Sequence, residues 1–207
     1  MKPALLLLLG CVAAHSATIV SVGGPVSFVG SVGSNQSLTA GFTTGQAYEN
    51  VQISALLSGI AGQTFNAYLT TSIGPGTTVA DQVAFTTAAF TGFSMDTVVF
   101  TGLSLTANTY YLTLFNPENT NGAWSSTNAP VVTAAPGSSH AFSGYFITND
   151  SPLPYPPAAD FANLLEESGR TLIYTVQTVA PVPEASTLGM TVLAGISLFA
   201  FARRRAS

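Results

Sequence analysis

Charged side chains are rare in this sequence. They make up 7% of the 207 residues, whereas about a quarter is typical of soluble domains. Between residues 18 and 180 there is no lysine, and Arg170 is the only base against eight acids, which gives this region a net charge of −7. Nucleic-acid binding requires clustered lysine and arginine that displace phosphate counterions. The sequence therefore excludes nucleic acid as a partner.

Histidine and cysteine are almost absent as well. Beyond residue 17, His140 is the only histidine and no cysteine remains. A Ser or Cys nucleophile needs a histidine base beside it, and zinc needs three or four His, Cys or carboxylate ligands. We interpret Ser138-Ser139-His140, in a glycine-rich turn, as a chance cluster, so we expect neither a catalytic triad nor a zinc site.

The acids do not form the carboxylate pair of a glycosidase, which needs two carboxyl groups about 5 to 9 Å apart. Glu166 and Glu167 are sequence neighbours that would point to different sides of a helix. Asp81, Asp96 and Glu118 are widely separated in the chain. We therefore expect no catalytic residue, no cofactor and no enzyme activity, which disfavours the hypothesis of a secreted hydrolase.

Apolar residues are abundant and predict a folded core. They make up 47% of the chain, and disordered chains have low hydrophobicity. Residues 51–55, 65–69 and 110–114 alternate with period two, as expected of half-buried strands. Turn signals rich in Gly, Pro and Asn separate about ten such stretches. The expected fold is an all-β, jelly-roll-like sandwich over residues 18–180.

One short helix is expected within residues 158–169. Phe161, Leu164 and Leu165 would share one of its faces, Asp160 could cap its start, and Gly169 could end it. A second helical turn is possible around residues 78–85.

The first 17 residues are typical of a secretory signal peptide. Lys2 is followed by an apolar stretch over residues 4–14 that is too short to span a bilayer. Ala14-His15-Ser16 fits a small-x-small cleavage site, and cleavage after Ala17 is also possible.

A bacterial lipobox is the alternative at this end. Residues 8–11 read Leu-Leu-Gly-Cys, which would make Cys11 the lipidated first residue. If Cys11 instead leaves with the signal peptide, the exported chain has no disulfide and depends on its core alone.

The other end of the chain is typical of a membrane span. Residues 185–202 form an uncharged stretch of 18 residues, which as a helix reaches about 27 Å, close to the thickness of a hydrocarbon core. Arg203, Arg204 and Arg205 follow at once, and the positive-inside rule keeps them cytoplasmic. The chain would thus be exported up to this segment and anchored there.

The tail, residues 181–207, resembles the PEP-CTERM sorting signal of exosortase substrates. The resemblance rests on a Pro-Glu motif (Val182, Pro183, Glu184, Ala185), the apolar span and the arginine cluster, in that order. The family's second proline is Ala185 here. The resemblance implies a Gram-negative bacterium that makes extracellular polysaccharide, and an exosortase that recognises Pro183-Glu184 at the membrane. These residues would be recognised and would not be catalytic.

A second resemblance concerns the fold alone. The stretch GLSLTANTYYLTL at residues 102–114 is similar to a strand pair found in the ectodomains of PEP-CTERM proteins and other secreted bacterial sandwiches. It implies no activity.

Aromatic residues are the candidates for sugar binding. Trp124 is the only tryptophan and follows a polar loop, while Tyr68 and Tyr111 are expected on the polar faces of their strands. An exposed ring at these positions could stack on a sugar. The alternative is that Trp124 caps the sandwich core.

Calcium is the one metal with a candidate loop. Asn116, Glu118, Asn119 and Asn121 lie within one short segment, and calcium takes oxygen ligands. Because only one of the four is a carboxylate, we interpret the segment as a turn-rich loop, with a calcium site as the alternative.

Two hypotheses for function follow. The first is an exported, non-enzymatic cell-surface or extracellular-matrix protein, membrane-anchored before an exosortase processes it. The second is a carbohydrate-binding β-sandwich module that attaches to exopolysaccharide.

Overall fold

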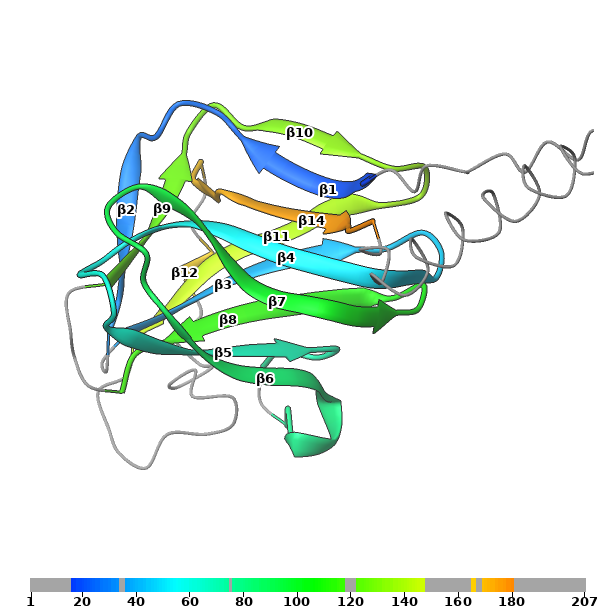
Figure 1. The fold of residues 1–207 in the computed structure, drawn as a ribbon, viewed down its shortest axis with the longest axis horizontal. Coiled ribbons are helices and arrows are strands. Elements are labelled where there is room, and N and C mark those ends of the chain that lie inside the picture. The colour runs from blue at the N-terminus through cyan, green and yellow to red at the C-terminus, as the bar shows by residue number, and fades with distance from the viewer. Residues whose placement is uncertain are drawn as a thin grey trace, which may run out of the picture. The chain divides into compact units, whose positions relative to one another are not determined.

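The described part of the chain is built almost entirely from antiparallel strands. A computed structural model describes residues 16–33, 36–74, 76–117, 122–147, 165–166 and 169–180. These strands form two sheets, here called sheet A and sheet B (Figure 1). The all-β prediction is therefore confirmed.

Sheet A contains the first and last strands of the described chain. Its main order is β10-β1-β14-β4-β9-β13, with β2 paired to β9 and β7 paired to β4. The strand bounds are β1 (Thr18–Gly23), β2 (Phe28–Val32), β4 (Tyr48–Ser58), β7 (Met95–Leu105), β9 (Gly122–Thr127), β10 (Val131–Ala134), β13 (Thr171–Leu172) and β14 (Tyr174–Thr178).

Sheet B has the order β12-β11-β3-β8-β5-β6. The strand bounds are β3 (Gln36–Thr43), β5 (Thr64–Thr70), β6 (Gln82–Ala89), β8 (Thr109–Phe115), β11 (Ser139–Ile147) and β12 (Leu165–Glu166).

One hydrophobic core receives side chains from both sheets. The period-two stretches predicted from the sequence supply it: residues 51, 53 and 55 of β4, residues 65, 67 and 69 of β5, and residues 110, 112 and 114 of β8 are all buried. Phe42 of β3 joins the sheets, because its ring lies 6.2 Å from that of Tyr174 in β14. Each buried side chain of this size contributes about 1.5 to 3 kcal/mol.

Sheet B buries hydroxyl groups on its other side as well. Thr39 of β3 and Thr113 of β8 are fully buried opposite the core side. Their hydroxyls lie 2.9 Å apart and satisfy each other, as buried polar groups must. The expectation that this side of β8 is a solvated polar face is therefore wrong.

The helix expected at residues 158–169 is contradicted where the structure describes it. Leu165 and Glu166 form strand β12, which pairs with Gly144 and Tyr145 of β11. The edge of β11 offers a ladder of backbone partners, and this pairing replaces the local helical bonds. Residues 158–164 lie outside the described range.

The helical turn expected around residues 78–85 is shorter than predicted. A 3-10 turn spans Val79–Asp81, with Thr78 as its cap. The Asp81 carboxylate accepts a hydrogen bond from the Thr78 backbone N–H at 2.8 Å, and the Thr78 hydroxyl accepts one from Ala80 N–H at 3.2 Å. The chain then enters β6, whose alternating side chains favour a strand.

Residues 15–179 form one compact unit, in which the described chain begins and ends at neighbouring positions. The Thr178 N–H donates to the carbonyl oxygen of Ala17 at 2.8 Å, and the Ser16 hydroxyl donates to the carbonyl of Thr178 at 2.8 Å. Chain entry and chain exit are therefore tied together.

The predicted address segments fall almost wholly outside the described residues. Only Ser16 and Ala17 of the expected signal peptide, and none of residues 181–207, are described. Within the described part of the chain, no helix has the length and hydrophobicity needed to cross a membrane.

Candidate binding pocket

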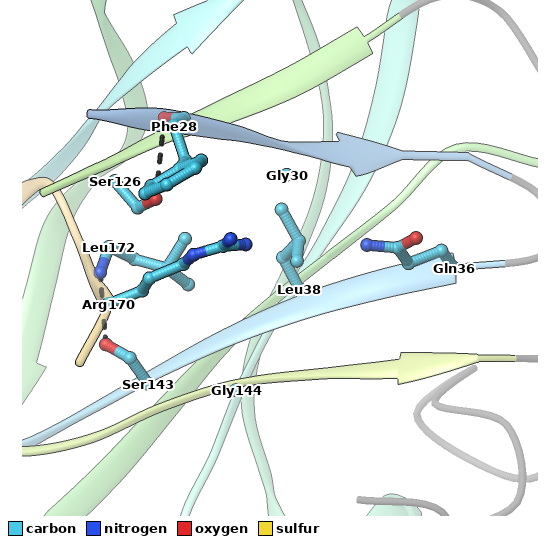
Figure 2. A pocket seen from close by; sticks show the side chains of 9 residues that line it. All are labelled: Phe28, Gly30, Gln36, Leu38, Ser126, Ser143, Gly144, Arg170 and Leu172. Carbon is cyan, nitrogen blue, oxygen red and sulfur yellow. Dashed lines mark hydrogen bonds between the residues drawn. The ribbon is translucent and has the colours of Figure 1, made fainter. Parts of the chain in front are cut away.

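A pocket lies where five strands of the two sheets meet. Its lining comes from β2 and β9 of sheet A, from β3 and β11 of sheet B, and from the short segment that enters β13 (Figure 2). The lining residues are Phe28, Gly30, Gln36, Leu38, Ser126, Ser143, Gly144, Arg170 and Leu172. Segments more than 100 residues apart in the chain therefore build one site.

Arg170 is the charged group of the pocket. Its guanidinium carbon lies 3.6 Å from the centre of the Phe28 ring, a distance typical of a cation–π contact. Arg170 is half-buried, while Phe28 is 43% exposed. The ring supports one face of the guanidinium and holds it at the pocket.

The backbone around Arg170 is fixed by serine side chains. The Leu172 N–H donates to Ser143 Oγ at 3.2 Å, which ties β13 to sheet B. The Ser126 hydroxyl donates to the carbonyl oxygen of Phe28 at 3.4 Å, which ties β9 to β2. These contacts position Arg170 and Phe28 from both sheets.

Gln36 and Leu38 of β3 complete the lining. Figure 2 shows Gln36 and Arg170 reaching toward the pocket from opposite sides, with Leu38 between them. Gly30 of β2 faces Leu38 so closely that an added Cβ would lie 2.8 Å from a Leu38 methyl carbon. Glycine at this position lets β2 approach β3.

The pocket is small. Its volume is about 40 Å³, and about 10 to 15 Å³ suffices for one water molecule. The interior therefore has room for a few waters or for one functional group of that size. A larger ligand would insert one group and leave the rest outside.

Trp124, a sugar-binding candidate, is buried. Its side chain is 0% exposed, and its Nε1–H donates to the carbonyl oxygen of Ile173 at 2.8 Å. An exposed Trp124 is therefore ruled out, and the alternative that it belongs to the core is correct. Burial of the large indole ring stabilises the folded protein, and the hydrogen bond to Ile173 satisfies the ring's one polar atom.

Tyr68 and Tyr111 lie on a different surface from Trp124. The pairing of β5 with β8 places both on the side of sheet B that faces away from the core. Tyr68 is only 8% exposed and packs on Phe85, with ring centres 4.9 Å apart; burial raises its pKa. Tyr111 is half-buried and meets Phe142 edge-on. The three candidates do not form one binding face.

The calcium candidate is described only at its first residue. Asn116 is fully buried, and Glu118, Asn119 and Asn121 lie outside the described range. Among the described residues, no three His, Cys, Asp or Glu side chains come together as a metal site would require.

His140 faces a tyrosine and not a serine. Its Nδ1 lies 2.9 Å from the Tyr174 hydroxyl, which also donates to the carbonyl oxygen of Gly41 at 3.1 Å. Burial lowers the pKa of His140 and raises that of Tyr174. In the chance cluster around it, Ser138 Oγ accepts a hydrogen bond from Gly45 N–H at 3.0 Å.

Two of the acids are separated by the length of a strand. Asp81 precedes β6 and Asp96 lies at the start of β7, on the far side of the β6–β7 turn. Eight strand residues span about 26 Å, well beyond the separation that a glycosidase pair needs.

Sequence reasoning did not find the pocket. Phe28, Gln36 and Ser126 carry no motif, and only the fold brings them to Arg170. The one signal available was that Arg170 is the only base between residues 18 and 180.

Comparison with known proteins identified no relative of this chain. No family model matches this chain, and no curated protein is significantly similar to it. The resemblance of the tail to a sorting signal therefore rests on the tail residues alone.

Proposed function

We propose that this chain is an exported, non-enzymatic cell-surface or extracellular-matrix protein that an exosortase sorts through its tail. The observation that carries the proposal is the order of Pro183-Glu184, the uncharged residues 185–202 and the three terminal arginines. The signal peptide at residues 1–17 would deliver the chain, and the span would hold it at the bacterial membrane until processing. The domain would then remain at the cell surface or in the matrix.

The ends of the described domain support this arrangement. Thr178 is hydrogen-bonded to both Ser16 and Ala17, and Val179 N–H donates to the carbonyl oxygen of Asn50. A tail that begins after Val179 would leave the domain beside the point where its chain begins.

The jelly-roll type of sandwich is part of the same proposal. In support of it, the last strand β14 inserts between β1 and β4. The last strand therefore pairs with strands that are distant in sequence and not with a hairpin neighbour. Such long-range connections are typical of Greek-key sandwiches.

Carbohydrate binding, for attachment to exopolysaccharide, is the second candidate function. The observation that favours it is a mixed pocket, in which Arg170, Gln36 and two serines lie beside leucines and a partly exposed aromatic ring. Ligand sites usually combine an apolar lining with a few placed polar groups.

Cell fractionation tests the sorting proposal. We expect the full-length chain to be held in the envelope, and a variant ending at Pro181 to appear in the medium. The double variant Pro183→Ala, Glu184→Gln should stay anchored in the membrane and should no longer be processed. Mass spectrometry of the protein should then show that the tail is still attached. A matched control makes the same two types of change outside the tail, as Pro25→Ala with Glu49→Gln. Identical distribution and mass for all variants would contradict the proposal.

A further inference from the structure

We propose that strand β6 is a docking edge for a second copy of this chain, so that two β6 strands pair antiparallel and join two copies of sheet B. The inference goes beyond both candidate functions and depends on neither. Strand β6 ends sheet B, and β5 is the only strand that pairs with it in the described part of the chain (Figure 1). An edge strand presents a row of backbone N–H and C=O groups to any further strand.

The hydrophobic core is open along β6. In the neighbouring strand β5, the core-facing side chains are fully buried, namely residues 65, 67 and 69. The side chains of β6 that face the same way, residues 84, 86 and 88, are only half-buried, and those that alternate with them are exposed. Val83 is 39% and Phe85 48% exposed. A second strand beside β6 would cover this apolar surface, which stabilises a contact.

The hydrogen-bonding direction along β6 follows from its last contact with β5. The Phe90 N–H donates to the carbonyl oxygen of Gln63 at 2.8 Å, and the Phe90 carbonyl oxygen accepts from Gly62 N–H at 3.0 Å. Backbone groups point to alternate sides along a paired strand, and the register with β5 is regular over residues 84–89. The backbone groups that point away from β5 are therefore those of residues 85, 87 and 89.

Other sheet edges of the described chain are protected, whereas β6 is not. Strands β10 and β12 are only four and two residues long. Strand β2 packs on β3 through Gly30 and Leu38, and β7 carries Asp96 and shifts its register three times along β4. Shortness, coverage, bulges and charge are what keeps edges from pairing. Strand β6 has eight residues with no charge and no proline, so its edge is suited to a partner strand.

Charge favours a second copy as that partner. The net charge between residues 18 and 180 is −7, so two copies repel each other unless they meet at an uncharged surface. Residues 82–95 carry no charge, and Asp81 lies directly before them. Antiparallel pairing about the middle of β6 keeps the two Asp81 side chains more than about 30 Å apart, whereas parallel pairing would place them side by side. A charged partner strand would find no opposite charge on β6.

The outward backbone groups also limit the register. Residues that exchange hydrogen bonds lie opposite each other in an antiparallel pair, so odd-numbered residues of β6 face odd-numbered residues of the copy. For the fullest overlap of residues 84–89, the two-fold axis passes beside Thr86 or Thr87, which then faces itself. Such a contact closes on itself as a dimer. Because β6 spans only about 26 Å, we expect a weak dimer that forms at high protein concentration.

Cysteine trapping of the full-length protein in detergent micelles tests the inference. Cys11→Ser supplies a background without cysteine. Single cysteines then replace Thr86, Thr87 or, as a control, the exposed Thr133 of strand β10. A residue that faces its own copy brings two Cβ atoms within reach of a disulfide. Under mild oxidation, Thr86→Cys or Thr87→Cys should form a covalent dimer at least about tenfold faster than Thr133→Cys.

A proline variant gives an independent readout. Thr87→Pro removes an N–H that points away from β5, a change that an edge strand tolerates, and should abolish the dimer. The matched control is Val132→Pro in β10, whose N–H points away from β1 because Ala135 N–H, three residues on, donates to Ile19; it should dimerise like the wild type. Sedimentation equilibrium over a range of protein concentrations measures the dimer, and the fluorescence of Trp124 reports whether each variant is folded.

Four outcomes would overturn the inference. They are a wild type that stays monomeric at every concentration, a dimer that Thr87→Pro leaves intact, trapping at Thr133 as fast as at Thr86 and Thr87, and growth into open polymers. With a monomeric wild type, a strand of a different protein would be the remaining occupant of this edge. Neither sorting nor sugar binding enters these measurements, so failure here leaves both candidate functions unchanged.

Discussion

The two ends of strand β9 each lie beside an aromatic ring, and the two rings differ in how exposed they are to solvent. Gly122 and Trp124 line a sealed part of the core, where Phe90 is 1% exposed. A Cβ added at Gly122 or at Gly59 would lie 2.3 or 2.4 Å from the Phe90 ring. The pairing of Ser58 with Ala123 makes these two glycines neighbours, and they lie against the two ends of the ring, Gly59 at Cγ and Gly122 at Cζ.

Ser126, at the other end of β9, belongs to the open pocket. There the ring of Phe28 is 43% exposed and supports a charged guanidinium. Phe90 packs inside the core, whereas Phe28 supports the guanidinium of Arg170 at the pocket. A buried ring without polar neighbours is structural, and an exposed ring that positions an arginine is suited to a ligand. Substitutions on the two sides should therefore separate stability from binding.

The largest expected effect is that of Trp124→Ala. It removes a fully buried ring and one of the two hydrogen bonds that the carbonyl oxygen of Ile173 accepts, the other coming from Leu56 N–H. We expect a loss of about 4 kcal/mol in the free energy of unfolding, measured by urea unfolding followed by far-UV circular dichroism. Trp124→Phe, which keeps most of the ring, should lose clearly less. Equal stability of Trp124→Ala and wild type would show that Trp124 is not in the core.

Gly122→Ala should follow in size. The new methyl group would overlap the Phe90 ring, which is already packed against Phe65 with ring centres 4.7 Å apart. Overpacking of this kind costs about 1 to 3 kcal/mol. The same urea experiment measures it.

A double-mutant cycle identifies the clash. If the ring is the obstacle, Gly122→Ala should destabilise a Phe90→Ala background much less than it does the wild type. Additive losses in the double variant would place the strain elsewhere.

The alternation of apolar and polar residues predicted correctly those strands that bury only one face. Val51, Ile53 and Ala55 alternate with polar residues, and each is buried as expected. The pattern failed where burial is two-sided: Tyr68 was expected on a polar face and is buried, and Thr113, on the same side of β8 as Tyr111, is buried too. Period two shows that neighbouring residues point in opposite directions, but it does not show what covers each side.

The pocket could not be predicted because its parts are brought together only by long-range pairing. Arg170 meets Phe28 because β13 and β2 both pair with β9. Similarly, Leu165–Glu166 has a helical pattern locally, and an available edge of β11 makes it a strand. In both cases the deciding partner is distant in sequence.

A pH effect is expected from His140, which is half-buried and lies 2.9 Å from the hydroxyl of the core residue Tyr174. Burial holds the pKa of His140 below its ordinary value of 6.5. The unfolded chain therefore takes up a proton at a higher pH than the folded chain does. The contribution of His140 is fully present above pH 6.5 and is lost as the pH falls through the folded-state pKa.

Urea unfolding at several pH values measures this effect. The urea concentration at the midpoint of unfolding should be lower at pH 5.5 than at pH 7.5. This decrease should be smaller than the decrease caused by either core substitution. In His140→Gln the fall should be smaller. An unchanged pH dependence in that variant would assign the effect to other groups.

The smallest effect on stability should come from the pocket, in Arg170→Gln and Phe28→Leu. A cation–π contact at a partly exposed site contributes about 0.5 to 1 kcal/mol, so both variants should unfold within about 1 kcal/mol of the wild type. If instead either variant were as unstable as Gly122→Ala, the Phe28–Arg170 pair would be part of the packed core, and the distinction between the two ends of β9 would not hold.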